Sequence, residues 1–155
     1  MEQYKVILVD DEADVISAME QKIQWNDLGF EVVGSATNGV KALELVEKMQ
    51  PDVVLTDIKM PYMDGLELAK RLNNDYPNIH IMICTGFDEF EYAKEAVHLE
   101  IEEYILKPVN AAELSESLNR LKATLDRERE EKRNVKKLEN YFNDVLPALR
   151  SNLFV

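Results

Sequence analysis

Residues 53–61 have the sequence VVLTDIKMP, an apolar and β-branched run that reaches an aspartate, Asp57, near its end. Its length, between Pro51 and Pro61, suits a strand better than a helix, and a continuous apolar strand is buried on both faces of a parallel sheet. In open parallel sheets, ligands bind beyond the carboxyl ends of the strands. Asp57 is therefore placed to meet a ligand, although an aspartate taken alone here more often begins a strand-to-helix turn.

Four more short apolar runs alternate with segments of helical periodicity. Strands joined in this way by short connections and helices predict right-handed crossovers, and therefore an α/β fold with a five-stranded parallel sheet and helices on both faces. The other predicted strands are Lys5–Val9, Phe30–Ala36, Ile79–Cys84 and Glu103–Leu106. The predicted helices are Ala13–Asn26, Val40–Met49 (capped by Asn38), Gly65–Asp75, Glu89–Leu99 and a fifth, of which the part up to about Leu125 is needed to cover the sheet.

The pattern changes along the C-terminal stretch. A leucine stripe continues to Leu125, residues 126–134 are mostly charged, and apolar residues resume at helical spacing from Val135. This stretch is either one long helix or two helices with a weak joint. We assign residues 1–125 to one domain and residues 126–155 to a helical linker. Because the linker has nothing in this chain to pack against, we expect it to meet a second copy or a missing neighbour.

Composition and charge limit the classes of partner and the compartment. The formal charge of −12 argues against DNA, RNA or an anionic membrane as a partner of these residues, because each is bound by clustered Lys and Arg. No secretory signal opens the sequence and no run has the length of a membrane span, so we expect a cytoplasmic protein. The single cysteine, Cys84, lies in an apolar run and is expected to be a core residue.

Chemically useful side chains follow several strands. In a parallel sheet the carboxyl ends meet at one edge, so these side chains are expected to converge. Crowded carboxylates either take up protons or bind a cation, and Mg²⁺ prefers a few carboxylates together with a phosphate oxygen. His80 and His98 lie elsewhere, which makes zinc improbable. The converging residues are Asp10 and Asp11 after the first strand, Asp57, Thr85 after the fourth strand and Lys107 after the fifth.

These residue types suit phosphoryl transfer. Lys107 supplies a compact positive charge and Thr85 a hydroxyl donor, both suited to phosphoryl oxygens. Carboxylates attack phosphorus to form aspartyl phosphates, and Asp57 is the natural nucleophile of this set.

The motifs together resemble the response-regulator receiver domain of two-component signalling, over about residues 4–125. The resemblance implies a flavodoxin-like sheet with strand order 2-1-3-4-5, and a sensor histidine kinase as the phosphoryl donor to Asp57. The motifs that carry it are Val9-Asp10-Asp11-Glu12, Thr56-Asp57-Ile58-Lys59-Met60-Pro61, Met63-Asp64-Gly65, Thr85-Gly86 and Tyr104-Ile105-Leu106-Lys107-Pro108.

The resemblance also implies roles for single residues. Asp11 and Asp57 would bind Mg²⁺ directly, Asp10 would help through water, and the backbone carbonyl of Lys59 would complete the protein ligands. Thr85 and Lys107 would contact the phosphoryl group. Tyr104 matches an aromatic residue that moves when the threonine is drawn to the phosphoryl group, and the Lys107–Pro108 bond is expected to be cis.

Residues 85–93, TGFDEFEYA, are similar to receivers whose output is an AraC-type DNA-binding domain. This second resemblance implies that the chain is a fragment and that the full-length protein binds DNA. From the expected movement of Thr85 and Tyr104, we hypothesise that phosphorylation changes a surface that pairs two copies as a homodimer. The resemblance to receivers implies self-directed phosphotransfer with slow autodephosphorylation, and no enzyme activity on other substrates.

Two other functions share features with this sequence. A phosphatase of the haloacid-dehalogenase type also uses a strand-end aspartate with Mg²⁺, but it needs a second aspartate two residues later, where this chain has Lys59. A binding module that has kept the fold and lost the chemistry is the other alternative, and the complete set of acceptor-site residues argues against it.

Overall fold

A computed structural model of the chain describes residues 3–89 and 99–153. These form two compact units, Met1–Asn119 and Arg120–Val155. The first unit contains a parallel five-stranded sheet with the predicted order β2-β1-β3-β4-β5. The strands are β1 (Tyr4–Val9), β2 (Phe30–Ala36), β3 (Val53–Asp57), β4 (His80–Thr85) and β5 (Glu103–Leu106).

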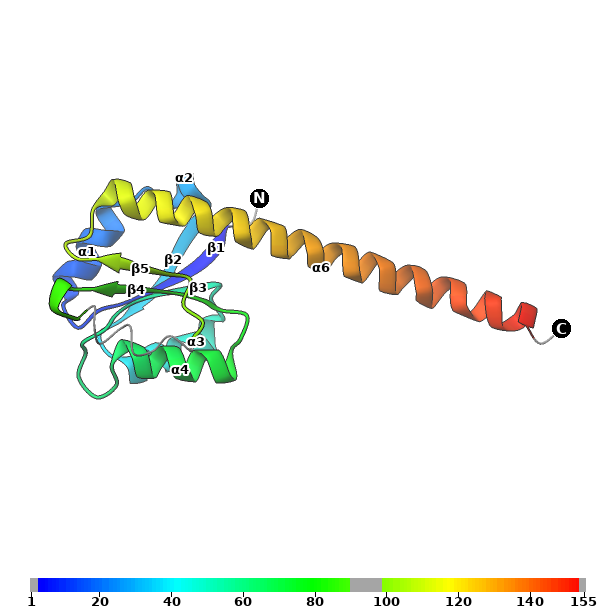
Figure 1. Cartoon of the computed structure of the whole chain (residues 1–155), viewed down its shortest axis with the longest axis horizontal. Coiled ribbons are helices and arrows are strands. Elements are labelled where there is room, and N and C mark those ends of the chain that lie inside the picture. The colour runs from blue at the N-terminus through cyan, green and yellow to red at the C-terminus, as the bar shows by residue number, and fades with distance from the viewer. Residues whose placement is uncertain (1–2, 90–98, 154–155) are drawn as a thin grey trace. The chain divides into compact units, whose positions relative to one another are not determined.

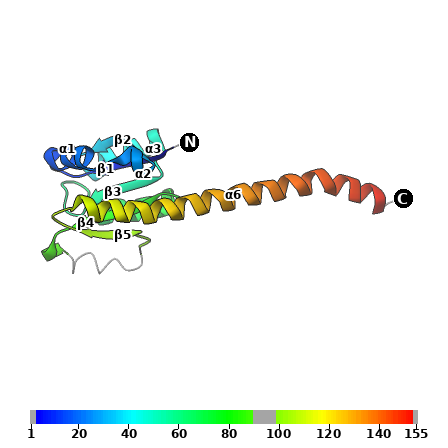
Figure 2. The same cartoon turned by 90° about the horizontal axis from the view of Figure 1, so that it is seen from above.

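Helices cover both faces of the sheet (Figures 1 and 2). Successive strand residues point to opposite faces, and both faces are covered, which explains why nearly all residues of β1, β3 and β4 are buried and most are apolar. Ile7 and Val54 belong to the buried cluster that includes Val46 and Leu68 of the covering helices. On one face lie α1 (Ala13–Lys22), α2 (Trp25–Leu28) and the first turns of α6 (Ala111–Leu153), and on the other lie α3 (Gly39–Met49) and α4 (Gly65–Asp75).

Local signals fix several helix starts. Asn38 caps α3, as predicted, because its side chain accepts a hydrogen bond from the backbone N–H of Lys41 at 2.9 Å. Asp64 does the same for α4, accepting from Glu67 N–H at 2.8 Å. The second of these caps fixes where the chain enters α4 directly after the loop that follows Asp57.

One predicted helix is wrong in its extent. The segment Ala13–Asn26 is divided into α1 and α2, because Ile23 adopts an extended conformation with φ −99° and ψ 134°. The indole N–H of buried Trp25 donates to the carbonyl of Met19 at 3.1 Å and satisfies an acceptor in the last turn of α1. The burial of Trp25 therefore ends α1 at Lys22, although the apolar spacing alone predicts that the helix continues to Asn26.

The C-terminal stretch is one helix, α6, and not two with a joint. The helix passes Pro147, which lacks a backbone donor and weakens the helical ladder there. A short 3₁₀ turn, η1 (Phe87–Glu89), follows β4, and the predicted helix Glu89–Leu99 lies almost wholly outside the described residues. Within the described ranges, no helix has both the length and the hydropathy that crossing a membrane requires.

Candidate functional site

Three carboxylates meet at the carboxyl edge of the sheet, as the sequence predicts. Asp10 follows β1, Asp57 ends β3, and ligand oxygens of these two and of Asp11 all lie within 4.8 Å of one another. Asp10 and Asp57 are buried, with 2% and 5% of their surfaces exposed, whereas Asp11 is exposed. The cluster therefore has two buried acids and one that faces solvent.

Backbone N–H groups hold the two buried carboxylates. The N–H of Glu12 donates to Asp10 Oδ1 at 2.9 Å, and the N–H of Ile58 donates to Asp57 Oδ1 at 2.9 Å. Both donors come from the first residues after a strand, where the backbone has left the sheet ladder. Each carboxylate is thus oriented by a backbone N–H that lies one or two residues after it in the sequence.

Lys107 brings a positive charge to the same place. Its Nζ lies 2.7 Å from Asp57 Oδ1 and 3.8 Å from Asp10 Oδ2. The backbone N–H of Lys107 donates to the carbonyl of Thr85 at 2.8 Å, which ties the residue after β5 to the end of β4. The Lys107–Pro108 bond is cis, in agreement with the resemblance.

The charges show that one lysine does not balance this site. Burial raises the pKa of Asp10 from 3.8 to about 6, and the nearby Asp57 and Asp11 add to that rise. Burial lowers the pKa of Lys107, but its hydrogen bond to Asp57 and the charges of both buried aspartates outweigh that effect and raise it. Three carboxylates and one ammonium leave an excess of negative charge, which a hard divalent cation with oxygen ligands would offset. The donor set therefore fits such a cation.

The two predicted switch residues, Thr85 and Tyr104, lie on the neighbouring strands β4 and β5. Thr85 is buried at the end of β4, and its hydroxyl donates to the carbonyl of Gly86 at 3.1 Å instead of to a carboxylate. Tyr104, in β5, is half-buried against the hydrophobic core, and burial raises the pKa of its phenol. Lys59 is exposed on the loop after β3, and its role as a carbonyl ligand stays a prediction.

Cys84 is a core residue, as expected. It is buried beside Asp57 in the β3–β4 register, and burial raises the pKa of its thiol to about 12. The thiol is therefore protonated and unreactive near neutral pH.

Gly65 has a positioning role that the sequence analysis did not assign. Its N–H donates to the carbonyl of Ile58 at 2.7 Å, and a Cβ at this position would overlap the carbonyl oxygen of Asp57. The start of α4 therefore lies against the backbone of Asp57, and only glycine permits that approach. The Asp64-Gly65 pair at the predicted helix start was the available signal.

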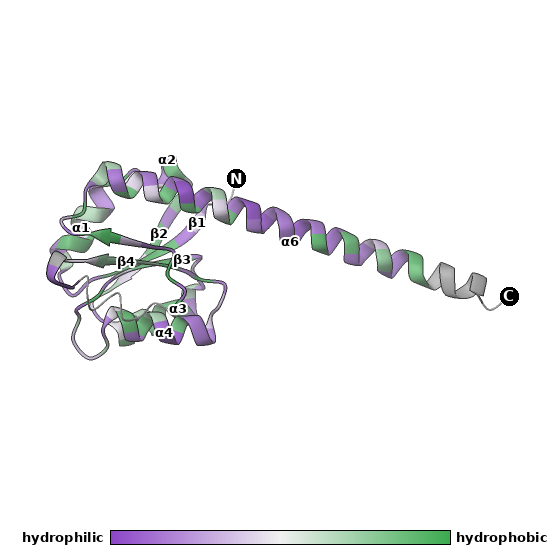
Figure 3. Ribbon diagram, in the orientation of Figure 1, coloured by the Kyte–Doolittle hydropathy of each residue, from purple (hydrophilic) through white to green (hydrophobic). Residues whose placement is uncertain are grey.

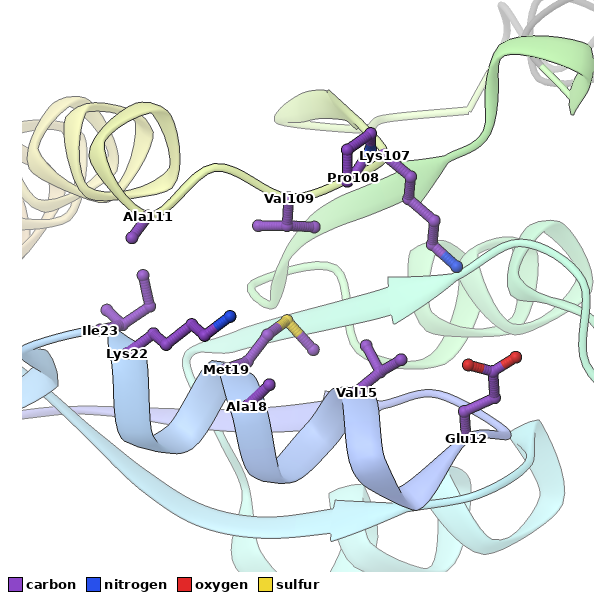
Figure 4. A pocket seen from close by; sticks show the side chains of 10 residues that line it. All are labelled: Glu12, Val15, Ala18, Met19, Lys22, Ile23, Lys107, Pro108, Val109 and Ala111. Atoms are coloured by element: carbon purple, nitrogen blue, oxygen red, sulfur yellow. The ribbon is translucent and has the colours of Figure 1, made fainter.

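A groove of about 550 Å³ opens beside Lys107, which is one of its lining residues (Figure 4). Its floor and walls come from α1 and from the segment that joins β5 to α6, and most of its lining side chains are apolar. A molecule bound in this groove would lie next to the carboxylate cluster. The sequence analysis did not predict the groove, whose apolar lining includes Val15, Ala18, Met19, Ile23, Pro108 and Val109.

Comparison with known protein families settles which family this geometry represents. The model of the response regulator receiver domain matches residues 6–119, which include all three carboxylates, Thr85 and Lys107. This chain belongs to the receiver domain family. The parallel sheet of order 2-1-3-4-5 and the acidic site at its edge are thus those of a receiver domain.

Individual relatives agree with this assignment. The chain is 39% identical over 142 residues to the uncharacterized transcriptional regulatory protein YesN of Bacillus subtilis, a match that covers 92% of this chain and 39% of YesN. It is 40% identical to the REC domain of AraT, a response regulator from Geobacillus stearothermophilus, with a TM-score of 0.78 over 81% of this chain and 98% of that domain.

A two-component transcriptional regulator AraC from Clostridium phytofermentans has a TM-score of 0.76 and 30% identity, covering 82% of this chain and 98% of that structure. The chain spans less than half the length of YesN and of the HptR regulator of Staphylococcus aureus.

Proposed function

We propose that this receiver domain accepts a phosphoryl group on Asp57. The observation that carries the proposal is the contact of 2.7 Å between Asp57 Oδ1 and Lys107 Nζ inside a cluster of three carboxylates. In the transfer, a carboxylate oxygen of Asp57 forms a bond to phosphorus, the phosphorus–nitrogen bond of a phosphohistidine breaks, and the freed imidazole takes up a proton. The donor is a sensor histidine kinase, as expected for two-component signalling.

Asp11 and Asp57, helped by Asp10 and the backbone carbonyl of Lys59, would hold Mg²⁺. When bound, the ion supplies positive charge that offsets the phosphoryl oxygens and the crowded carboxylates. Lys107 is already in contact with Asp57 and holds one carboxylate oxygen in place. The groove beside Lys107 gives a donor protein an apolar surface to contact next to the acceptor.

Phosphorylation adds nearly two negative charges beside Asp10, and Lys107, with Nζ 3.8 Å from Asp10 Oδ2, is a compensating positive group. The hydroxyl of Thr85, which bonds to the carbonyl of Gly86, would turn toward the new phosphoryl oxygens. Its departure frees space for Tyr104 to move inward, and the surface around β5 changes. The altered surface pairs two receivers, and residues 126–155 pass the change to an AraC-type output domain that binds DNA.

The domain is a signalling acceptor located in the cytoplasm, and it is not a phosphatase acting on other molecules. Its only chemistry is transfer to its own Asp57 and slow loss of that group by hydrolysis. Lys59 stands where a phosphatase of the haloacid-dehalogenase type would need its acid–base aspartate.

Intact mass spectrometry after incubation with acetyl phosphate tests the proposal. The wild-type chain should gain the mass of one phosphoryl group with Mg²⁺ and none in EDTA, and Asp57→Asn should gain none. Uptake by Asp57→Asn, or none by the wild type, would contradict the proposal. Turnover of a phosphate monoester would instead favour the phosphatase.

A further inference from the structure

The second unit of the chain exposes a row of large apolar side chains on α6. Val135, Leu138, Tyr141, Phe142 and Leu146 are between 41% and 59% exposed. Earlier in the same helix the leucines are buried: Leu114 and Leu118 have no exposed surface, and Leu121 and Leu125 have 2% and 6%. Figure 3 shows hydrophobic residues returning along α6 after a mostly hydrophilic stretch.

The spacing of the exposed residues indicates what covers them. Val135, Leu138, Phe142 and Val145 follow one another at intervals of three, four and three residues, the a and d positions of a heptad repeat. This period of 3.5 residues keeps an apolar seam facing another helix of the same kind. The buried Leu114, Leu118, Leu121 and Leu125 follow the same alternation, so what distinguishes the later residues is that their seam is exposed.

The charge distribution favours a second copy of the same segment. Residues 126–146 contain six basic and six acidic residues, so this segment has no net charge, although the chain as a whole carries −12. Two such segments approach each other without net repulsion, whereas two copies of the rest of the chain repel. The basic block formed by Arg133, Lys136 and Lys137 occupies the outer positions of the heptad, away from the seam.

The flanking positions favour a parallel arrangement in register. With Val135 and Phe142 at a, Tyr141 falls at g and Leu146 at the following e position. In a parallel two-stranded coil, g of one helix lies against the next e of its partner, so Tyr141 would meet Leu146 on both sides of the seam. The rings of Tyr141 and Phe142 already contact each other, with centroids 5.9 Å apart, and form one apolar ridge.

We infer that residues 135–146 pair with the same segment of a second copy as a parallel two-stranded coiled coil, with or without phosphorylation. The segment is short, about 18 Å at 1.5 Å per residue, so the association is weak and depends on concentration. Pairing of the two linkers tethers the two receiver domains to each other and raises the effective concentration of each for the other. The inference does not depend on the proposed phosphoacceptor function.

Sedimentation of the whole chain in EDTA, without a phosphoryl donor, tests the pairing. The wild type and Asp57→Asn should both shift from monomer to dimer over about a hundredfold range of concentration. Leu138→Lys, which places a charge in the seam, should remain monomeric. Asn140→Lys makes the same charge change on the outer face and should behave like the wild type. A wild type that stays monomeric, or an Asn140→Lys variant that loses the dimer as Leu138→Lys does, overturns the inference.

Cysteine cross-linking tests the register. Leu138→Cys should give a disulfide-linked dimer under a mild oxidant, since equivalent d positions of a parallel coil are adjacent, whereas Asn140→Cys should not. Cys84 is buried and does not interfere. A dimer in sedimentation that gives no cross-link through Leu138→Cys would overturn the parallel arrangement. The variants at Leu138 and Asn140 should still take up the phosphoryl group. A failure of the pairing would therefore appear in sedimentation, and a failure of the acceptor function in phosphoryl uptake.

Discussion

At the scale of single residues, the site depends on three groups whose charges do not balance. Asp10 and Asp57 are buried, and Lys107 contacts Asp57 at 2.7 Å but reaches Asp10 only at 3.8 Å. Burial is the main cause of the raised pKa of Asp10, the charges of Asp57 and Asp11 add to it, and Lys107 offsets it only in part. Keeping Asp10 buried and charged lowers the free energy of unfolding, and a bound cation would offset that cost.

The pKa of Asp10 leads to a prediction about stability and pH. Because this pKa rises from 3.8 in the unfolded chain to about 6 in the folded protein, the folded state binds more protons between these values. The contribution of Asp10 to the free energy of unfolding therefore falls as pH increases from about 4 to about 6. In EDTA, Asp10→Asn should remove this loss and raise the free energy of unfolding at pH 7 by at most about 3 kcal/mol.

Urea unfolding of the wild type and Asp10→Asn at pH 4 and pH 7 measures this difference. The gain from the substitution should be large at pH 7 and small at pH 4. An equal effect at both pH values would show that the charged form of Asp10 does not lower the free energy of unfolding.

Gly65 is the residue whose replacement should disturb the acceptor most directly without changing a charge. A methyl group at Gly65 would overlap the carbonyl of Asp57, so Gly65→Ala should lower the free energy of unfolding by about 2 kcal/mol and displace Asp57. Gly34→Ala is the matched control, because a Cβ there meets only the side chain of Leu45 at 3.4 Å. Thermal unfolding of both variants measures the difference, and equal Tm values would contradict the close approach.

At the scale of elements, the spacing of apolar residues predicted most of the strands and helices, and capping residues marked where helices begin. Strand Phe30–Ala36 and helix Gly65–Asp75 have their predicted bounds, because proline, glycine and a capping aspartate mark their ends locally. The division between α1 and α2 could not be predicted in this way. It depends on the burial of Trp25 and on its bond to Met19, which are tertiary facts without a local signal.

Side-chain convergence at the sheet edge was likewise predictable from topology, but distances were not. The order of the strands brings Asp10, Asp57 and Lys107 to one edge, and their residue types suggested a cation site. That Lys107 contacts Asp57 more closely than Asp10, and that Gly65 lies against the backbone of Asp57, follow only from coordinates.

Within α6 the two halves should differ in local stability. Leu118 and Leu125 are buried, whereas Val135 and Leu138 are more than half exposed. Helix without packed side chains opens easily, so amides of residues 127–146 should exchange quickly in a dilute sample and those of residues 114–125 slowly. Hydrogen exchange with mass spectrometry measures both segments, and slow exchange throughout a monomeric helix would contradict this account.

At the scale of the whole molecule, all the net negative charge lies outside the linker, since residues 126–155 contain seven basic and six acidic residues and the chain carries −12. Unphosphorylated receivers should therefore repel each other, and a specific change of surface is needed to pair them. In a chain whose pairing through α6 is removed, the monomer–dimer balance is then a readout of the state of Asp57.

Beryllofluoride, which mimics a phosphoryl group on aspartate, should shift the receiver toward dimer. The measurement is sedimentation of the Leu138→Lys chain, in which pairing through α6 is removed, with Mg²⁺ and with or without beryllofluoride. An unchanged mass would contradict phosphorylation-dependent pairing of the receiver surface. Asp57→Asn in the same background should show no response.

The central claim is that Asp57 is the residue that receives the phosphoryl group. After incubation with acetyl phosphate and Mg²⁺, borohydride reduction converts an aspartyl phosphate to homoserine, and peptide mass spectrometry locates it. The account predicts homoserine at position 57 alone. Homoserine at Asp10 or Asp11, or none at any position, would contradict it.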